Sequence, residues 1–304
     1  MNLLSIAGFT NLGYRVHARS FEESRPDMSA KTVLITGATG GLGKATARSL
    51  ADLGARVIAV GRDAAKLDAL REELTGDVVT ARADLSLLAE IHRLAGTVLE
   101  SEPRLDVLIN NVGVLLPGRQ VTEEGLETTL ATNLAGQFLL TNLLVSHLVA
   151  SAPARIVNVS SGGMYAERIR PDDLQFEKSP YRGSVAYART KRGQVILTEM
   201  WAQRLAGTGV VVHGMHPGWA STAGVERSLP MFNRLMGPLL RTPEEGADTI
   251  VWLASAEEPG GSTGRFWFDR AVAPTHLTES TRERPGEREA LWSALAALTG
   301  FDAS

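Results

Sequence analysis

Short hydrophobic runs alternate with amphipathic helical stretches along most of this chain. The runs are rich in valine, isoleucine and leucine, as expected of strands that are covered on both faces of a sheet. Strands separated by helices connect through right-handed crossovers into a parallel sheet. The alternation therefore predicts an α/β fold, a doubly wound three-layer sandwich with a seven-stranded parallel sheet. The predicted strands are residues 32–36, 56–60, 78–83, 105–110, 155–160, 210–215 and 264–268.

The same pattern predicts how the chain is divided. A length of 304 residues accommodates one large domain or two small ones. Because the alternation continues without a break, we expect a single domain over residues 30–275. Residues 1–29 precede the first strand and end in a polar stretch, so we expect an N-terminal extension. Residues 276–304 are expected to form a C-terminal linker, solvated over 279–289, and a short helix over 290–298.

Composition excludes several classes of protein. The chain has no cysteine, which excludes disulfides, thiol catalysis and cysteine-bound metals. His213 and His216 lie three residues apart, but two histidines are too few for a metal site, so none is expected. A net charge of −3 without a basic cluster argues against a nucleic-acid partner. The lack of cysteine is compatible with a reducing compartment, and we expect a cytoplasmic protein.

We expect no segment to cross a membrane, because polar residues interrupt the longest apolar candidate, residues 134–150. The first residues lack the charged start and the cleavage site of a secretion signal. Phe9, Leu12 and Val16 recur at helical spacing and could line one face of a short helix. We expect that face to pack on the domain or on a partner subunit, with contact to a membrane surface as the alternative.

A glycine-rich segment follows the first predicted strand and opens the first predicted helix. Gly37 allows a tight turn there, Gly41 lets the backbone approach a pyrophosphate, and Gly43 permits close packing of strand and helix. The N–H groups at the start of the helix attract an anion. The segment therefore predicts a Rossmann-type dinucleotide site. Its predicted cofactor-binding residues are Gly37, Thr39, Gly40, Gly41, Leu42 and Gly43.

The ends of the second and third predicted strands indicate which nicotinamide cofactor is bound. An acidic residue usually ends the second strand when the cofactor carries a free ribose hydroxyl. Here that position is Gly61, and Arg62 follows it. A guanidinium pairs well with a 2′-phosphate, so we expect NADP(H) in preference to NAD(H). After the third strand, Asp84 and Leu85 are predicted to lie at the adenine, although Ser86 could make this a plain helix-capping loop.

Polar residues also follow the next strands. Ligands of doubly wound sheets bind outside the carboxyl ends of the strands. Asn111 and Gly113 follow the fourth predicted strand and are therefore assigned to the cofactor site, and Asn133 lies in the long helix after them. The fifth strand ends in two serines, and either could contact the substrate. The position relative to the strand end favours Ser161 over Ser160.

Tyr187 and Lys191 share one face of a predicted helix because they lie four residues apart. A free phenol has a pKa near ~10 and is a poor base at neutral pH. An ammonium group ~5 Å away, at an effective dielectric of ~20, favours the phenolate by about 3 kcal/mol, or roughly two pKa units. Tyr187 could then exchange a proton with an alcohol or a carbonyl while hydride moves to or from the nicotinamide. Ser161 would bind the substrate oxygen, Lys191 could hold the nicotinamide ribose, and Asn133 could fix a water.

Together these motifs resemble the short-chain dehydrogenase/reductase superfamily over residues 31–270. Within it, one subgroup is similar over residues 159–164, 187–192, 198–203, 215–220 and 264–270. The resemblance implies a catalytic tetrad formed by Asn133, Ser161, Tyr187 and Lys191. Of these, Tyr187 and Lys191 would also contact the cofactor. The segment after the sixth strand would meet the nicotinamide through Pro217, Gly218 and Thr222.

The predicted activity is the NADP(H)-dependent interconversion of an alcohol and a carbonyl in an apolar substrate, with Tyr187 as general acid and base. Two alternatives stay open. The chain could bind NADP(H) as a sensor or scaffold without catalysis, or it could be a dehydratase or epimerase on the same fold. The superfamily resemblance also implies a homodimer or homotetramer.

Overall fold

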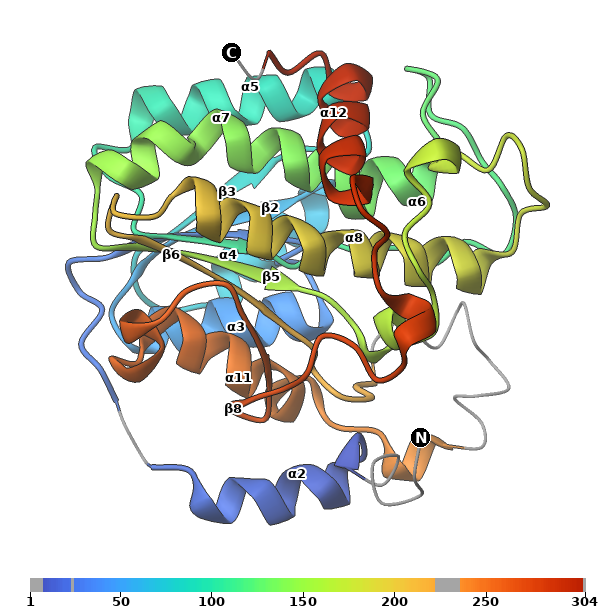
Figure 1. The fold of residues 1–304 in the computed structure, drawn as a ribbon. Coiled ribbons are helices and arrows are strands. Elements are labelled where there is room, and N and C mark those ends of the chain that lie inside the picture. Colours follow the sequence, from blue (N-terminus) through green and yellow to red (C-terminus); the bar gives the residue numbers. More distant parts are fainter. Residues whose placement is uncertain (1–7, 23–24, 222–235, 303–304) are drawn as a thin grey trace.

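The computed structural model describes residues 8–22, 25–221 and 236–302, and the predicted α/β fold is confirmed. Eight strands form one sheet in the order β3-β2-β1-β4-β5-β6-β7-β8 (Figure 1). Each pair of neighbouring strands in this order, from β3 to β7, is parallel. The strands are β1 Thr32–Thr36, β2 Arg56–Gly61, β3 Val78–Arg82, β4 Val107–Asn110, β5 Ala154–Val159, β6 Val210–Met215, β7 Arg265–Phe268 and β8 Ala271–Val272.

The sheet has one strand more than predicted. β8 is two residues long, pairs antiparallel with β7 and is exposed. Asp269 and Arg270 make the connecting turn with positive φ angles of 49° and 59°. Hairpin turns of this kind are normally recognised from Asn-Gly or Asp-Gly pairs. Neither the turn residues nor a two-residue strand gives a sequence signal, which explains why β8 was missed.

Helices cover both faces of the sheet (Figure 1). One face is covered by α3 (Gly41–Asp52) and α11 (Pro243–Ser255). The opposite face is covered by α5 (Leu88–Ser101), α7 (Gly136–Ala150) and α8 (Gly183–Arg204). The remaining elements are α2 Asn11–His17, η1 Ala18–Ser20, α4 Ala64–Glu73, α6 Thr128–Leu130, η2 Ala131–Ala135, η3 Gly162–Tyr165, η4 Pro171–Asp173, η5 Gly237–Leu239, η6 Glu258–Gly261, η7 Glu279–Thr281 and α12 Glu287–Thr299.

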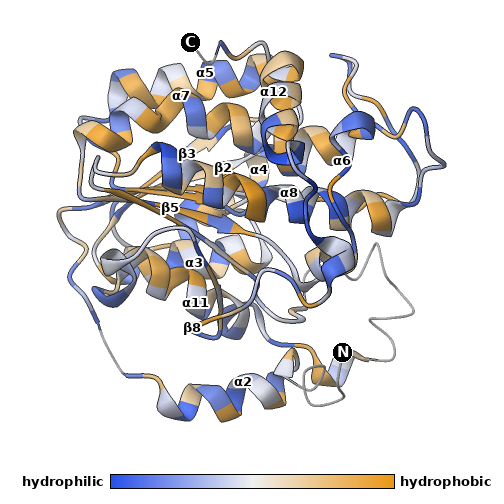
Figure 2. Ribbon diagram, in the orientation of Figure 1, coloured by the Kyte–Doolittle hydropathy of each residue, from blue (hydrophilic) through white to orange (hydrophobic). Residues whose placement is uncertain are grey.

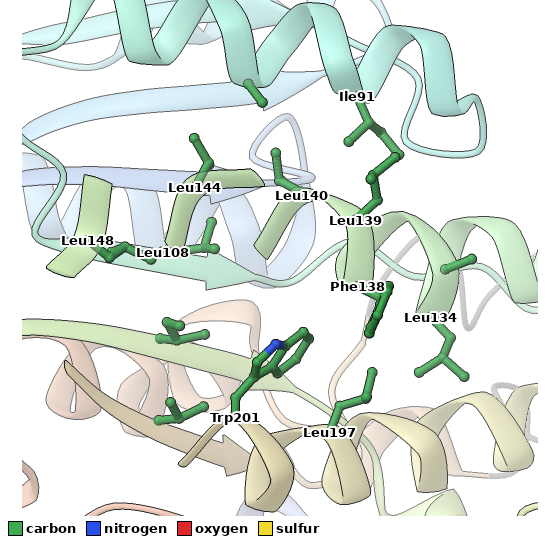
Figure 3. Packing of buried hydrophobic residues seen from close by; sticks show 14 of the residues in the cluster. Ile91, Leu108, Leu134, Phe138, Leu139, Leu140, Leu144, Leu148, Leu197 and Trp201 are labelled. Atoms are coloured by element: carbon green, nitrogen blue, oxygen red, sulfur yellow. The ribbon is translucent and has the colours of Figure 1, made fainter. Parts of the chain in front are cut away.

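The larger hydrophobic core lies between the sheet and the α5–α7–α8 layer. Leu197 and Trp201 of α8 lie opposite Phe138 of α7, and Leu144 approaches β4 (Figure 3). The rings of Phe138 and Trp201 stack with their centroids 6.2 Å apart. Burying each side chain of this size contributes about 1.5–3 kcal/mol. The strands beneath are predominantly hydrophobic (Figure 2), which matches their coverage on both faces.

One helical stretch in the described part of the chain, Thr128–Ala150, is long and apolar enough by length and composition to cross a membrane. Its apolar window is 61% buried inside the protein. Phe138, Leu139, Leu140 and Leu144 in this stretch are fully buried. Contacts within the core therefore account for its hydrophobicity.

The two terminal segments differ from expectation in detail. Of the predicted apolar face on the N-terminal extension, Phe9 is buried, whereas Leu12 and Val16 are 58% and 61% exposed. Phe9 therefore packs on the domain, as predicted, whereas the packing of Leu12 and Val16 on a partner subunit stays a prediction. The C-terminal helix begins at Glu287, three residues earlier than predicted. The ring centroid of Trp292 in this helix lies 4.9 Å from that of Phe138. This helix, α12, is thus part of the main core.

Candidate active site

The turn after β1 has the shape of an anion cradle. Gly37 and Gly41 have positive φ angles of 69° and 52°, which favour glycine. A Cβ on Gly43 would lie 2.2 Å from the carbonyl oxygen of Gly37, so only glycine fits there. A Cβ on Gly40 would meet nothing within 4 Å, and Gly40 provides no side-chain cap for α3. The first N–H groups of α3 are therefore available to a phosphate, and the turn fits a dinucleotide.

Asn111 joins this turn to the end of β4. Its side-chain Nδ2 donates to the carbonyl oxygen of Thr36 at 2.8 Å. The backbone N–H groups of Asn111 and Val112 donate to the hydroxyl of Thr36 at 2.9 and 3.1 Å. β1 and β4 are neighbours at the point where the strand order reverses, which is where doubly wound sheets bind ligands. Asn111 therefore fixes the geometry of the cradle.

The end of β2 has no room for a carboxylate. A Cβ on Gly61 would lie 2.6 Å from Cγ2 of Thr39, so a side chain there would displace the cradle. Arg62 follows with a side chain that is 71% exposed and 3.8 Å from the Asp84 carboxylate. A cation therefore stands at this strand end in place of an acid.

The loop after β3 is partly occupied by its own contacts. Oδ1 of Asp84 accepts hydrogen bonds from the backbone N–H of Ser86 at 2.9 Å and from its hydroxyl at 2.7 Å. Leu85 is 5% exposed and packs in the core. Its carbonyl oxygen lies against Gly136, where a Cβ would come within 2.3 Å. Ser86 does not cap α5, since the N-cap is Leu87 without a side-chain cap and the N–H groups of Leu88 and Ala89 donate to the carboxylate of Glu124. Oδ2 of Asp84 lies 3.8 Å from the Arg62 guanidinium.

Two serines end β5, and the structure separates their roles. The hydroxyl of Ser160 is buried and donates to the carbonyl oxygen of Lys191 at 2.8 Å. The hydroxyl of Ser161 instead accepts from the N–H of Gly163 at 3.2 Å. It lies beside the ring of Tyr187, because a Cβ on Gly163 would lie 3.6 Å from Oγ of Ser161 and 3.7 Å from Cε1 of Tyr187. Ser161 is therefore the serine that lies beside the proposed proton donor.

Lys191 lies beneath the tyrosine. Its Nζ is 5.5 Å from the centroid of the Tyr187 ring and donates to the carbonyl oxygen of Val159 at 2.9 Å. A Cβ on Gly113 would lie 3.2 Å from this Nζ and 3.7 Å from Oδ1 of Asn133. The ends of β4 and β5 and the helices η2 and α8 thus bring the four predicted residues and Gly113 together.

Asn133 lies in a π turn, η2, between α6 and α7. Its side-chain amide accepts from the N–H of Val114 at 2.7 Å and donates to the carbonyl of the same residue at 2.9 Å. A π turn interrupts the regular helical ladder. Nε2 of Gln194 donates to the carbonyl oxygen of Asn133 at 2.9 Å. Sequence reasoning missed Gln194; its only signal is a polar residue on the otherwise buried side of α8.

Burial sets the pKa values of the central pair. Burial lowers the pKa of Lys191 to about 7. Burial also raises the pKa of Tyr187 above its ordinary value, and the neighbouring Ser161 hydroxyl, which lowers this pKa, offsets only part of that rise. The predicted lowering of the tyrosine pKa was therefore wrong in direction. Coulomb attraction alone favours the phenolate, but removing both charged groups from water opposes it and dominates here.

The first residues after β6 pack near the cradle. A Cβ on Gly246 of α11 would lie 2.5 Å from Leu42 of the cradle and 3.6 Å from the carbonyl oxygen of Pro217. Gly218 has a φ of 73°, and a Cβ there would lie 2.4 Å from Nε of Arg241. Thr222 lies outside the described residues. Sequence reasoning also missed Arg241, whose contacts connect segments far apart in the chain.

Comparison with known proteins agrees with this geometry. A family model described as short chain dehydrogenase matches residues 31–231. The chain belongs to the short-chain dehydrogenase/reductase family. It is 37% identical to dehydrogenase/reductase SDR family member 12 of Bos taurus, covering 95% of this chain and 93% of that protein. It is 38% identical to retinol dehydrogenase 14 of Homo sapiens, covering 90% of this chain and 88% of that protein.

A solved structure of an uncharacterized protein from Mycobacterium paratuberculosis has a TM-score of 0.74 and 30% identity, covering 90% of this chain and 95% of that chain. The short-chain dehydrogenase/reductase described here is thus an NAD(P)-dependent oxidoreductase. Its cradle, the open space over Gly40 and the absence of a side-chain cap on α3 fit a nicotinamide dinucleotide.

Proposed function

We propose that this enzyme reduces a carbonyl to an alcohol, or catalyses the reverse, with NADP(H) and with Tyr187 as the proton-transferring residue. The observation that carries the proposal is that Ser161 and Tyr187 lie side by side after β5, since a Cβ on Gly163 would lie 3.6 Å from Oγ of Ser161 and 3.7 Å from Cε1 of Tyr187, with Nζ of Lys191 5.5 Å from the centroid of the tyrosine ring. A relative named as a retinol dehydrogenase supports an alcohol as the substrate class. The apolar character of the substrate is part of the proposal.

The bound nicotinamide would supply or accept the hydride. In the reducing direction, the Tyr187 hydroxyl donates its proton to the carbonyl oxygen, and the Ser161 hydroxyl holds that oxygen in place. The ammonium of Lys191 stabilises the phenolate that remains. Because burial raises the pKa of Tyr187, the phenol is protonated at neutral pH. A protonated Tyr187 can donate a proton to a carbonyl but cannot accept one from an alcohol, so this protonation state favours carbonyl reduction over alcohol oxidation.

The pKa of Lys191 predicts how carbonyl reduction depends on pH. With a pKa of about 7, Lys191 is charged below that pH and neutral above it. The charge supports loss of the Tyr187 proton, so kcat/KM for the carbonyl should be highest below pH 7. It should fall by up to about tenfold per pH unit above pH 7. We would measure kcat/KM from pH 6 to 9 at saturating NADPH.

Lys191→Arg is the control for this profile, because an arginine stays charged over the whole range. The fall above pH 7 should disappear in this variant, whatever its absolute rate. A wild-type profile that is flat between pH 6 and 9 would contradict the assigned role of the lysine charge.

Cofactor preference depends on Arg62. Replacing it by glutamate in Arg62→Glu should weaken NADPH binding by about tenfold or more, because a charge-assisted contact becomes a repulsion. NADH, which has no 2′-phosphate, should bind with little change. Fluorescence titration with both cofactors measures this difference. Arg71→Glu on α4 makes the same charge change away from the cradle and should alter neither affinity. Equal losses for NADPH and NADH in Arg62→Glu would remove the argument for NADPH.

A substrate screen tests the function itself. After the titration, NADPH oxidation would be followed with a panel of apolar aldehydes and ketones, and NADP⁺ reduction with the matching alcohols. We expect turnover with at least one carbonyl. Tight NADPH binding without turnover across the panel would favour the sensor or scaffold alternative. A substrate that loses water, or is inverted at a carbon centre, without net oxidation of the cofactor would favour a dehydratase or an epimerase.

The proposal includes a cytoplasmic homo-oligomer. Leu99 on α5 and Val149 on α7 are 43% and 36% exposed, and their helices are neighbours in the same layer. We propose this side of the sheet as the place of the subunit contact.

A further inference from the structure

The N-terminal extension inserts an aromatic ring between two segments of the candidate active site. Phe9 is only 8% exposed. Its ring centroid lies 4.9 Å from that of His216 and 5.7 Å from that of Trp219, both in the segment that follows β6. On its other side, a Cβ on Gly162 would lie 3.8 Å from the Phe9 ring. Gly162 directly follows Ser161, so the ring contacts both the loop after β5 and the segment after β6, which is predicted to meet the nicotinamide.

The backbone of the extension is paired with the segment after β6. The N–H of Trp219 donates to the carbonyl oxygen of Phe9 at 2.8 Å. The N–H of Arg241 donates to the carbonyl oxygen of Trp219 at 2.7 Å, and the N–H of Ser221 donates to that of Arg241 at 2.9 Å. Residues 219–221 therefore have backbone partners on two sides, and one of these partners is the extension.

Arg241 connects the same segments through its side chain, which is 1% exposed. The guanidinium donates to both carboxylate oxygens of Asp269 at 2.5 and 2.8 Å. It also donates to the carbonyl oxygens of Gly8 at 2.8 Å, Thr10 at 3.3 Å and Pro217 at 3.3 Å. One buried side chain thus contacts the extension and the predicted nicotinamide-binding segment at once.

The rest of the extension is anchored along α2, which lies below α11 in Figure 1. His17 contacts the Asp269 carboxylate at 2.7 Å, and Arg15 contacts Glu245 of α11 at 3.4 Å. Leu12 and Val16 of this helix are exposed, so apolar burial along α2 contributes little. A terminal segment stays ordered only where it is tied down. The buried contacts that hold the extension are the ring contacts of Phe9 and the hydrogen bonds of Arg241, next to the candidate active site.

We propose that Phe9 is a positioning residue of the active site. Its ring sets the spacing between the loop that carries Ser161 and the loop that carries Pro217 and Gly218. The first loop holds the proposed substrate contact and the second the predicted nicotinamide contacts, so their spacing governs how the substrate meets the cofactor. This inference rests on the proposed function. A misplacement of about 1 Å can lower an enzymatic rate by about 10²-fold, so the effect is measurable.

The test compares three full-length variants with the wild-type enzyme. Phe9→Ala removes the ring, Phe9→Leu keeps most of its volume, and Phe21→Ala removes another aromatic ring of the same extension. Phe21 is a matched control because it packs on Tyr14, with centroids 6.0 Å apart, and under Arg270 at 4.4 Å. The measurements are kcat and KM for a carbonyl from the screen, the dissociation constant of NADPH, and backbone amide exchange in residues 160–166 and 216–221.

We expect Phe9→Ala to lower kcat by about tenfold or more while the NADPH dissociation constant changes by less than about threefold. Exchange should become faster in both loops. Phe9→Leu should recover most of the rate, and Phe21→Ala should match the wild type. Equal kinetics and exchange for Phe9→Ala and Phe21→Ala would overturn the inference, as would a parallel loss of NADPH binding and turnover in Phe9→Ala.

If the proposed function is wrong, the outcome differs from a failure of the positioning role of Phe9. In that case the wild-type enzyme turns over no substrate of the screen, and amide exchange alone decides the inference. Faster exchange in both loops of Phe9→Ala, without the same change in Phe21→Ala, supports the positioning role of the ring. Unchanged exchange refutes that role.

Discussion

Replacing Tyr187 by phenylalanine is expected to lower kcat/KM for carbonyl reduction by about 10²–10⁴-fold. The ring is retained over Lys191, 5.5 Å from its Nζ, so the packing of the site is preserved. Only the hydroxyl of the ring that lies beside Ser161 is lost, and with it the proposed proton donor. NADPH binding, measured by fluorescence titration, should stay close to that of the wild-type enzyme. Turnover is measured with the best carbonyl from the screen.

Tyr181→Phe is the matched control, because it also removes a partly buried phenol hydroxyl. That hydroxyl contacts Thr129 at 3.0 Å and Glu127 at 3.2 Å and lies in none of the motifs assigned to the site. Tyr181→Phe should therefore retain turnover. If Tyr187→Phe retains turnover as well, the proton comes from another group and the proposed mechanism is wrong.

The parallel sheet could be predicted because its strands are covered on both faces. Val33, Leu34 and Ile35 are each fully buried, and such uninterrupted apolar runs are distinctive in a sequence. The exposed β8 has no comparable pattern. The N-terminal face was predicted from apolar spacing alone, but spacing does not say which face finds a partner. Phe9 is buried within this chain, whereas Leu12 and Val16 are exposed on it.

The candidate site could be located for a topological reason. Parallel strands bring their carboxyl ends to one edge, so Gly37, Asn111 and Ser161 had to lie near one another once the strands were assigned. The connections of Gln194 to Asn133 and of Arg241 to Asp269 span 61 and 28 residues. They depend on how helices and loops pack, which no local pattern records.

The pKa of Tyr187 shows a different limit of sequence reasoning. The i, i+4 spacing of Tyr187 and Lys191 correctly predicted their proximity, and Coulomb's law then predicted an acidified phenol. The solvent that each group loses on folding cannot be read from the spacing, and Lys191 is only 3% exposed. In this dry environment the electrostatic interaction is stronger once a charge forms, but forming the charge costs more. The ammonium therefore acts on the phenolate as the proton leaves, and the resting phenol is neutral.

The largest expected effect on stability comes from Arg241. Arg241→Met should lower the free energy of unfolding by about 3–5 kcal/mol, because it leaves the buried carboxylate of Asp269 without its bidentate partner. Asp269 would keep its contact with His17 at 2.7 Å, and the carbonyl oxygens of Gly8 and Pro217 would lose their donor. Urea unfolding followed by circular dichroism measures the loss.

Arg270→Met provides the comparison that isolates burial as the cause. Arg270 makes the same bidentate contact with Asp248, at 2.9 and 2.6 Å, but these two side chains are 21% and 17% exposed. The Arg241 and Asp269 side chains are 1% and 3% exposed. Water can solvate Asp248 after its partner is removed, so Arg270→Met should cost only about 1 kcal/mol. Equal losses in the two variants would mean that the hydrogen-bond geometry, and not the burial of the carboxylate, determines the stability that Arg241 contributes.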